Sequence, residues 1–221
     1  MPSLPLEPLP ATTDTAGVRA AEADVSRVIA YGCGGPGGAV AGSAWPVGDD
    51  LMLTNAHVVA GSYSQTVQPP GRQPLAAEVV LFDPDVDVAI LRVPGIGLSP
   101  LPIAGAYPPA GTQGAVIGYP GGGAEATVAA AVRGTENAST WNIYYSGYVT
   151  RETVVVSADV IPGDSGGPVV DLAGRVIGVT FAMSTTTSNE GYALATSDIT
   201  SDLQAAQGRT AAVGDGGCVD G

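Results

Sequence analysis

The chain has 221 residues, of which 45% are hydrophobic, and it carries a formal net charge of −13. A charge this negative argues against a nucleic-acid partner and against binding to anionic membranes, because both require a cationic surface. The apolar content is sufficient for a core, which excludes a wholly disordered chain. The single His excludes metal centres built on two or three imidazoles, and we expect neither a metal nor another cofactor.

The first part of the chain is predicted to be an extension. Residues 1–12 alternate Pro with apolar residues, which is typical of an extended linker, and residues 13–24 are compatible with a short helix. The start of the chain lacks the basic and apolar segments of a signal peptide, and no apolar run is long enough to span a bilayer. We therefore expect a fragment of a longer exported protein.

From residue 25 onward, short β-like runs alternate with clusters of Gly and Pro. About a dozen such runs without intervening helices predict an all-β sandwich or barrel. The expected strands are Val25–Tyr31, Ala39–Pro46, Leu51–Thr54, Ala77–Phe82, Val88–Val93, Ala115–Tyr119, Ala126–Val132, Tyr144–Thr150, Val154–Val160, Pro168–Val170, Val176–Phe181 and Gly191–Ala195. Gly95–Gly114, rich in Pro and Gly, is the natural connection between two lobes.

The end of the chain contains one clear helix signal. We predict a helix over Ser197–Ala206, with Ser197 as its N-cap, Asp198 in its first turn and Gly208 after its end. The remaining tail is flexible by composition unless a cysteine anchors it.

Two cysteines, Cys33 and Cys218, lie near the two ends of the patterned region. This arrangement favours one long-range disulfide over a metal site, which would require a cluster of ligands. Two unpaired thiols are the alternative. A disulfide would indicate an oxidising compartment.

Three segments carry residue types that together suggest nucleophilic catalysis. An apolar strand ends just before His57, Asp87 leads into a second buried strand, and Ser165 lies on a Gly-rich turn, Pro162–Pro168. A Ser hydroxyl needs a neutral imidazole to accept its proton and a carboxylate to orient that imidazole. The sequence therefore predicts a catalytic triad of His57, Asp87 and Ser165.

Asp83 and Asp85 are alternatives to Asp87 as the acid of this triad. The sequence Asp83-Pro-Asp85 is typical of a turn, whose acidic side chains are usually solvated. Asp87 directly precedes Val-Ala-Ile-Leu and is expected to be the buried carboxylate.

The turn that carries Ser165 also predicts an oxyanion hole. Flanking glycines allow successive backbone N–H groups to point to one place, and we assign the hole to Gly163 and Ser165, with Asp164 between them. The same turn matches the nucleophile elbow of α/β-hydrolases, but in those enzymes the His follows the Ser, and here none does. A triad in the chain order Asp, His, Ser, with Asp49 or Asp50 as its acid, would require a larger parallel α/β fold. The strand pattern contradicts such a fold.

The motifs resemble the three signatures of chymotrypsin-like, trypsin-fold serine proteases. They are Thr54-Asn-Ala-His57, Asp87-Val-Ala-Ile-Leu and Gly163-Asp-Ser165-Gly-Gly-Pro. The resemblance implies an all-β fold of two antiparallel six-stranded β-barrels with a short C-terminal helix and an active site between the barrels. The expected organisation is an N-terminal extension at 1–24, barrels at 25–105 and 106–196, and a C-terminal helix and tail at 197–221.

Further segments resemble the periplasmic protease domain of MarP-type, membrane-anchored actinobacterial serine proteases. These segments are Ala56–Gly61, Gly118–Pro120, Ser146–Arg151 and Gly216–Cys218. The resemblance implies a preceding transmembrane region, a bracing disulfide, and a role in acid or envelope stress.

The resemblance therefore implies a periplasmic or extracellular serine endopeptidase that cleaves polypeptides through an acyl-enzyme. We also expect such an enzyme to trim its own exposed segment at residues 1–24. We expect no membrane contact by this fragment itself. The alternative is a catalytically silent, protease-fold binding module. The chain lacks the Ile-Val-Gly-Gly-like start of digestive relatives, so we expect Asp164 to be solvated or paired locally, for instance with an Arg.

The specificity pocket is the last expectation. Asp159 lies where the resemblance places the pocket floor, and there it would receive Arg or Lys at P1. We favour the alternative, in which Asp159 faces solvent and Val160 lines an apolar pocket. Three consecutive residues are expected to form another wall: Phe181, Ala182 and Met183.

Overall fold

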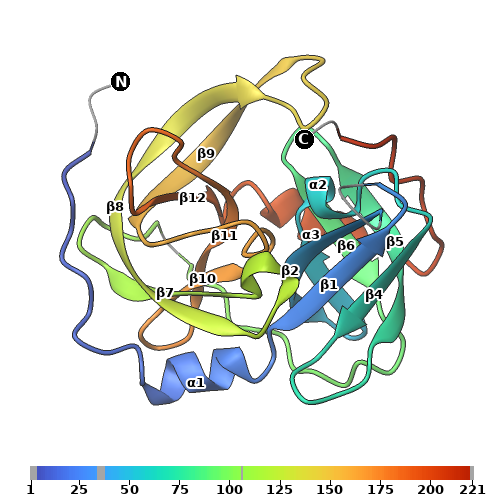
Figure 1. The fold of residues 1–221 in the computed structure, drawn as a ribbon, viewed down its shortest axis with the longest axis horizontal. Coiled ribbons are helices and arrows are strands. Elements are labelled where there is room, and N and C mark those ends of the chain that lie inside the picture. The colour runs from blue at the N-terminus through green and yellow to red at the C-terminus, as the bar shows by residue number, and fades with distance from the viewer. Residues whose placement is uncertain (1–3, 34–37, 106, 220–221) are drawn as a thin grey trace.

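The chain forms two closed barrels of antiparallel strands, seen side by side in Figure 1 of a computed structural model that describes residues 4–33, 38–105 and 107–219. The first barrel contains β1 (Ser26–Tyr31), β2 (Ala39–Gly48), β3 (Leu51–Thr54), β4 (Ser64–Gln68), β5 (Leu75–Asp83) and β6 (Val88–Arg92). The second contains β7 (Gln113–Gly118), β8 (Ala126–Trp141), β9 (Tyr148–Ser157), β10 (Pro168–Asp171), β11 (Val176–Met183) and β12 (Glu190–Ala195).

The strand orders are β1-β2-β3-β6-β5-β4 and β10-β11-β12-β9-β8-β7, and each sheet closes on itself. The prediction of an all-β fold with two antiparallel six-stranded barrels is confirmed. The predicted boundary between residues 105 and 106 falls in the connection between β6 and β7, and residue 106 lies outside the described residues.

One hydrophobic cluster spans both barrels. It combines Trp45, Leu53 and Ile90 of the first barrel with Ile117 and Leu194 of the second, all fully buried. Strands β6 and β10 bury nearly every side chain that they carry. Strands buried on both faces have continuous apolar sequences, as Val-Ala-Ile-Leu in β6 does. The shared core fixes one barrel against the other, which a site built from both barrels requires.

Short helices connect and flank the strands: α1 (Ala16–Glu22), α2 (Ala56–Val59), the 3-10 turn η1 (Pro120–Gly122) and α3 (Thr200–Ala206). Among the described residues, no helix has the length and apolar character needed to cross a membrane.

The predicted start of α3 is wrong. The helix begins at Thr200, and the Ser197 hydroxyl donates to a Glu152 carboxylate oxygen at 2.9 Å instead of capping the helix. The Asp198 carboxylate accepts from the Glu152 N–H at 2.6 Å, so it also lies before the helix. Contacts with β9, distant in sequence, override the local capping signal.

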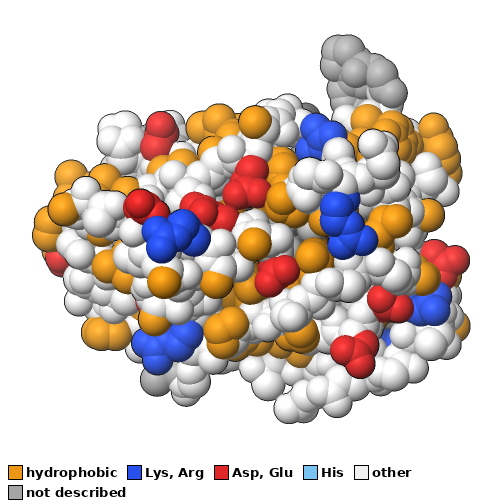
Figure 2. Space-filling model, turned by 90° about the horizontal axis from the view of Figure 1, so that it is seen from below, with side chains coloured by type: hydrophobic (Ala, Val, Ile, Leu, Met, Phe, Trp, Pro, Cys, Tyr) orange, Lys and Arg blue, Asp and Glu red, His pale blue; other side chains and the backbone are white. Residues whose placement is uncertain are grey.

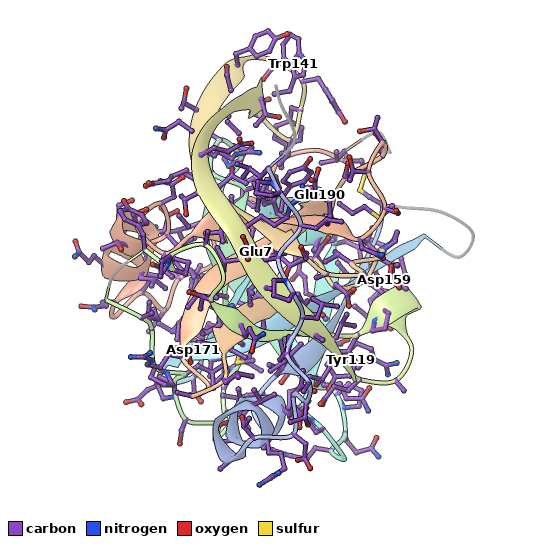
Figure 3. All side chains as sticks on the ribbon, turned by 90° about the vertical axis from the view of Figure 1, so that its left-hand side faces the viewer. Glu7, Tyr119, Trp141, Asp159, Asp171 and Glu190 are labelled. Carbon is purple, nitrogen blue, oxygen red and sulfur yellow. A yellow bond between two sulfur atoms is a disulfide. The ribbon has the colours of Figure 1, made fainter. Side chains whose placement is uncertain are left out.

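The N-terminal segment lies along the second barrel (Figure 3). Arg133 of β8 donates from Nε to the Pro5 carbonyl at 3.1 Å and also donates to the Leu4 carbonyl. Its guanidinium pairs with Glu190, and both side chains are buried. The segment is extended, as predicted for a linker, but it is hydrogen-bonded to the barrel from Leu4 onward. Residues 1–3 lie outside the described residues.

Helix α1 continues this attachment. The Thr15 side chain caps it by accepting from the Val18 N–H at 3.1 Å, and Val18 is fully buried. Gly17 packs so closely on the turn after β10 that an added Cβ would lie 2.2 Å from the Ala173 carbonyl carbon. The helix predicted within residues 13–24 is therefore part of the packed structure.

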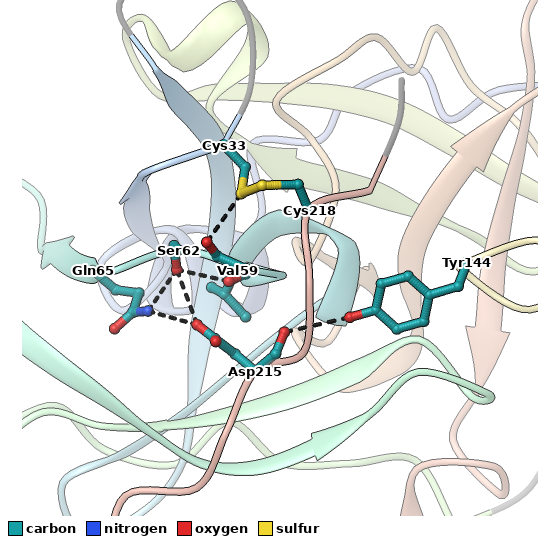
Figure 4. Close-up of a disulfide and its surroundings, with 8 residues drawn as sticks. Cys33, Val59, Ser62, Gln65, Tyr144, Asp215 and Cys218 are labelled. Atoms are coloured by element: carbon teal, nitrogen blue, oxygen red, sulfur yellow. Dashed lines mark hydrogen bonds between the residues drawn. A yellow bond between two sulfur atoms is a disulfide. The ribbon is translucent and has the colours of Figure 1, made fainter.

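The C-terminal tail is fastened to the first barrel (Figure 4). Cys33 and Cys218 form a disulfide with Cα atoms 5.5 Å apart, as predicted. The Asp215 carboxylate accepts hydrogen bonds from Ser62 Oγ at 3.2 Å and from Gln65 Nε2 at 3.1 Å. The tail is therefore anchored at several points besides Cys218.

Candidate active site

His57 lies on α2, directly after β3. The short helix places the backbone N–H of His57 2.9 Å from Oδ1 of Asp87, while the ring Nδ1 lies 2.8 Å from Oδ2. One carboxylate therefore engages both the backbone and the imidazole of His57. This double contact fixes the ring and assigns its Nδ1 as the proton donor to Asp87.

Asp87 lies in the turn between β5 and β6. Asp83 builds this turn, because its Oδ1 accepts from the Asp85 N–H at 2.8 Å and from the Val86 N–H at 2.9 Å. Asp87 adopts a φ of +73°, which is unusual for a residue with a side chain, and Asn55 Nδ2 donates to its carbonyl at 2.9 Å. Asp87 is 3% exposed, whereas Asp85 is exposed. Among the three candidate acids, Asp87 is the one against the imidazole.

The surroundings of His57 act on its pKa in opposite directions. Burial is the largest influence and lowers the pKa, since it disfavours the charged ring. The charge of Asp87 and its hydrogen bond raise the pKa, and the charge of Arg151 lowers it. The net result is a pKa above the usual 6.5. The imidazolium is therefore stabilised, as a base that must hold a proton during a reaction requires.

Ser165 lies on a tight turn before β10 that only glycine can build at two positions. Gly163 and Gly166 have φ values of +104° and +82°. A Cβ on Gly166 would lie 2.3 Å from the Ser43 carbonyl oxygen and 2.4 Å from Thr54 Oγ1. The glycines therefore let the turn approach the first barrel closely.

Ser43 of β2 holds this turn from the first barrel. Its N–H donates to the Ser165 carbonyl at 2.8 Å, and its Oγ donates to the Gly163 carbonyl at 2.8 Å. The same Oγ accepts from the Tyr119 N–H at 2.9 Å. Ser43 thus connects the turn bearing Ser165 to the barrel bearing His57.

The backbone of the turn leaves two donors free. The Asp164 N–H donates to the Ile161 carbonyl at 3.1 Å, so it is not available to an oxyanion. Within the described part of the chain, neither the Gly163 N–H nor the Ser165 N–H donates a hydrogen bond. The two N–H groups assigned from the sequence therefore remain candidates, and the Asp164 N–H does not.

The Asp164 side chain is buried and paired locally. Its Oδ2 accepts from the Ile161 N–H at 3.0 Å, so the partner is a backbone amide, not an Arg. Burial raises the pKa of this carboxyl and so does the charge of Asp159, while the hydrogen bond from Ile161 lowers it. Asp164 therefore closes the turn through a hydrogen bond within it.

The cavity beside Ser165 has a volume of about 200 Å³. Its walls include four of the residues predicted for the substrate pocket: Val160, Phe181, Ala182 and Met183. Asp159 is exposed and does not line the cavity. The walls are mainly apolar and contain no charged side chain, so the cavity fits an apolar side chain better than a cation.

A second cavity, of about 300 Å³, lies beside His57. His57 and Asp87 line it together with Phe181, which also borders the Ser165 cavity. Phe181 is therefore a wall shared by the cavity that His57 lines and the cavity that Ser165 lines. No hydrogen bond joins Ser165 Oγ to His57 among the described residues, and such bonds are often long without a substrate.

Residues 42–179 match the family model described as a trypsin-like peptidase domain. The match spans both barrels and includes His57, Asp87 and Ser165. The chain belongs to the trypsin-like peptidase family.

Several proteins of this family are similar to the chain. Serine protease Rv3671c of Mycobacterium tuberculosis is 41% identical over 179 residues, which are 80% of this chain and 45% of that protein. Protease Do-like 2, chloroplastic, of Arabidopsis thaliana is 33% identical, over 70% of this chain and 26% of that protein. The chain thus spans less than half the length of these curated relatives.

Solved structures show the same relationship. The crystal structure of the Rv3671c protease from M. tuberculosis in its active form matches with a TM-score of 0.93 and 37% identity, covering 100% of this chain and 96% of that chain. The HtrA-type protease AlgW with a tripeptide matches with a TM-score of 0.74 and 25% identity, covering 86% of this chain and 62% of that chain.

The sequence did not reveal every residue that builds the site of this trypsin-like peptidase. Ser43, Asn55 and Arg151 all contact the site. Asn55 lies within the motif Thr54-Asn-Ala-His57, so its position was a usable signal. Ser43 and Arg151 carry no local signal, because their partners lie far away in the sequence.

Proposed function

We propose that the chain is a serine endopeptidase that works through a triad of Ser165, His57 and Asp87. The observation that carries the proposal is the contact of one buried carboxylate with both the N–H and the ring of His57, the only His of the sequence. Ser43 supports it further, because its hydrogen bonds hold the turn of Ser165 against the barrel that carries His57. The active-form crystal structure of Rv3671c, at a TM-score of 0.93, is more similar than the inactive form, at 0.81.

In the proposed reaction, Ser165 Oγ attacks the scissile carbonyl carbon and transfers its proton to Nε2 of His57. Asp87 holds the ring through Nδ1 and stabilises the imidazolium. The Gly163 and Ser165 N–H groups donate to the oxyanion. His57 then protonates the leaving amine, an acyl-enzyme remains on Ser165, and a water activated by the same imidazole hydrolyses it.

A fluorophosphonate probe tests this proposal. It should label the wild-type protein at Ser165, because the probe reacts with activated Ser hydroxyls. Ser165→Ala and His57→Ala should abolish labelling, while Ser197→Ala, which removes an exposed hydroxyl outside the cleft, should not. Folded wild-type protein that remains unlabelled and cleaves no peptide would support the alternative, a silent binding module.

The apolar cavity supports a preference for apolar P1 residues. Peptides with Leu or Tyr at P1 should be cleaved with higher kcat/KM than peptides with Arg at P1, because Val160 and Phe181 offer apolar area and no carboxylate. Asp159→Asn should leave this ranking unchanged, since Asp159 lies outside the cavity. Efficient Arg cleavage that is lost in Asp159→Asn would contradict the apolar assignment.

The proposal extends to an exported protease anchored by a preceding transmembrane region and linked to acid or envelope stress. The disulfide supports an oxidising compartment. One relative is a probable periplasmic serine endoprotease of Pseudomonas fluorescens, 32% identical over 59% of this chain. Polypeptides are the proposed partners, and self-cleavage is included. On the face drawn in Figure 2, acidic and basic side chains are interspersed.

A further inference from the structure

A buried arginine shares the cavity of His57. Arg151 lies on β9 of the second barrel and is only 4% exposed, although arginine is rarely buried without a charged partner. It lines the cavity of about 300 Å³ together with His57 and Asp87. Besides Asp87, Arg151 is the charged group that acts on the pKa of His57 among the described residues.

Two contacts fix the orientation of Arg151. Its Nε donates to the Asp85 carbonyl at 2.8 Å, and its guanidinium carbon lies 5.7 Å from the centre of the Phe181 ring. Nη2 is buried and has no hydrogen-bond partner among the described residues. A guanidinium has five N–H donors, so hydrogen bonding alone does not explain why Arg151 lies at this buried position.

The hairpin of β8 and β9, which carries Arg151, also contacts the loop that carries Asp87. Asn142, directly after β8, donates from Nδ2 to Asp85 Oδ1 at 3.0 Å. The Ile143 N–H donates to the Pro84 carbonyl at 3.2 Å. The loop between β5 and β6, which belongs to the first barrel, is therefore held by the second barrel at Pro84 and Asp85.

The charged groups around Arg151 come from two places. Asp83, Asp85 and Asp87 face it from the loop between β5 and β6, and Asp198 faces it from the segment after β12. Burial lowers the pKa of Arg151 and these carboxylates raise it. The guanidinium stays protonated under all working conditions. The imidazole itself is faced by Asp87 and Arg151, and Tyr145 lies on the cavity wall.

We propose that Arg151 is a positioning residue of this site, which fixes the loop bearing Asp87 and sets the lower pH limit of hydrolysis. The proposal rests on the proposed function, since it assigns His57 as the base. A permanent cation beside Asp87 offsets part of the carboxylate's charge, so the carboxylate stabilises the imidazolium less. His57 then stays neutral, and able to accept the Ser165 proton, to a lower pH than Asp87 alone would allow.

The single histidine permits a direct test. In a Ser165→Ala background, the ring signals of His57 are followed by NMR against pH, without assignment ambiguity and without self-digestion. In Arg151→Met and Arg151→Gln the titration midpoint of His57 should move to higher pH, because the opposing cation is gone. Arg151→Lys, which keeps the charge, should titrate near the parent, and so should Arg175→Met, which removes an exposed cation paired with Asp171.

The kinetic experiment uses variants that retain Ser165 and can therefore hydrolyse peptides. For Arg151→Met, the ratio of kcat/KM at pH 5.5 to that at pH 8 should fall by roughly three- to tenfold, with Arg151→Lys restoring it. Arg151→Gln can still donate to Asp85 and replaces the Met variant where that one does not fold.

Folded neutral variants whose His57 midpoint equals that of the parent would overturn the proposal. A Lys variant shifted as far as the Met variant would also do so. Absence of fluorophosphonate labelling in the wild type would instead refute the proposed function. The NMR titration would still report on the action of Arg151 on His57.

Discussion

At the residue scale, the site depends on small residues as much as on reactive ones. His57, Asp87 and Ser165 were predicted from their order along the chain and from the residues next to them, since a strand before the His and glycines around the Ser are local signals. Ser43 was not predicted, because an interior Ser on an apolar strand gives no local signal. Its role arises from hydrogen bonds to Gly163 and Ser165, which lie on the other barrel.

Gly166→Ala tests the close approach of the two barrels. The new Cβ would lie 2.3 Å from the Ser43 carbonyl oxygen, at a φ of +82° that Ala resists, so the turn must shift. We expect a loss of about 2–4 kcal/mol in the free energy of unfolding and loss of fluorophosphonate labelling.

Gly71→Ala is the matched control for that variant. Gly71 also has a positive φ, of +64°, but nothing lies within 4 Å of its added Cβ. It should cost only the strain of the backbone, about 1 kcal/mol, and labelling should persist. Equal urea midpoints for the two variants would show that the contact with Ser43 is unimportant.

At the element scale, the sequence predicted strands best where their burial is uniform. β6 and β10 carry continuous apolar runs and were found close to their true bounds. β4 was missed, because Ser64–Gln68 buries only Gln65 and Val67 and is otherwise polar. β9 was predicted as two strands, Tyr144–Thr150 and Val154–Val160, because polar residues such as Arg151 interrupt its middle. Arg151 is buried and donates to the Asp85 carbonyl of the other barrel, a contact that no local pattern can reveal.

The packing of α3 on the first barrel leads to a prediction about pH. Asp202 of α3 is 8% exposed, and its Oδ2 has no partner among the described residues. Burial, with a contribution from the charge of Asp83, raises its pKa to about 6 from 3.8, although Arg209 opposes this. Between pH 3.8 and about 6, the folded protein therefore keeps a proton on Asp202 that the unfolded chain has already released. The free energy of unfolding falls as the pH rises through this window.

Asp202→Asn should remove this pH dependence. At pH 8 the variant should be more stable than the wild type by about 1–2 kcal/mol, and below pH 4 the difference should largely disappear. Thermal unfolding of the variant and the wild type at several pH values measures the stability difference at pH 8 and below pH 4. Asp14→Asn, on an exposed carboxylate, should change stability little at any pH. A variant that is less stable than the wild type at pH 8 would contradict the prediction.

At the scale of the whole molecule, the described segments near both ends of the chain, from Leu4 onward and up to Val219, are structural parts of the barrels. A chain that lacks residues 1–9 loses the carbonyl partners of Arg133 from Leu4 and Pro5. We expect its free energy of unfolding to fall by about 1–2 kcal/mol, in urea denaturation of the Ser165→Ala protein.

A chain that lacks only residues 1–3 keeps those hydrogen bonds and is the control. If both truncations unfold at the same urea concentration, the N-terminal segment contributes nothing to stability. A large difference would also mean that self-cleavage within this segment has an energetic cost for the barrels.

The Ser43 contact has a consequence for the order of assembly. Ser43, His57 and Asp87 all belong to the first half of the chain, whereas the Ser165 turn is completed only near its end. Domains commonly fold as units, N-terminal first. In the proposed mechanism, a half-made chain has the base His57 but no nucleophile, because Ser165 takes its place only when the second barrel docks against Ser43. We therefore expect an unfinished chain to cleave no peptide bond.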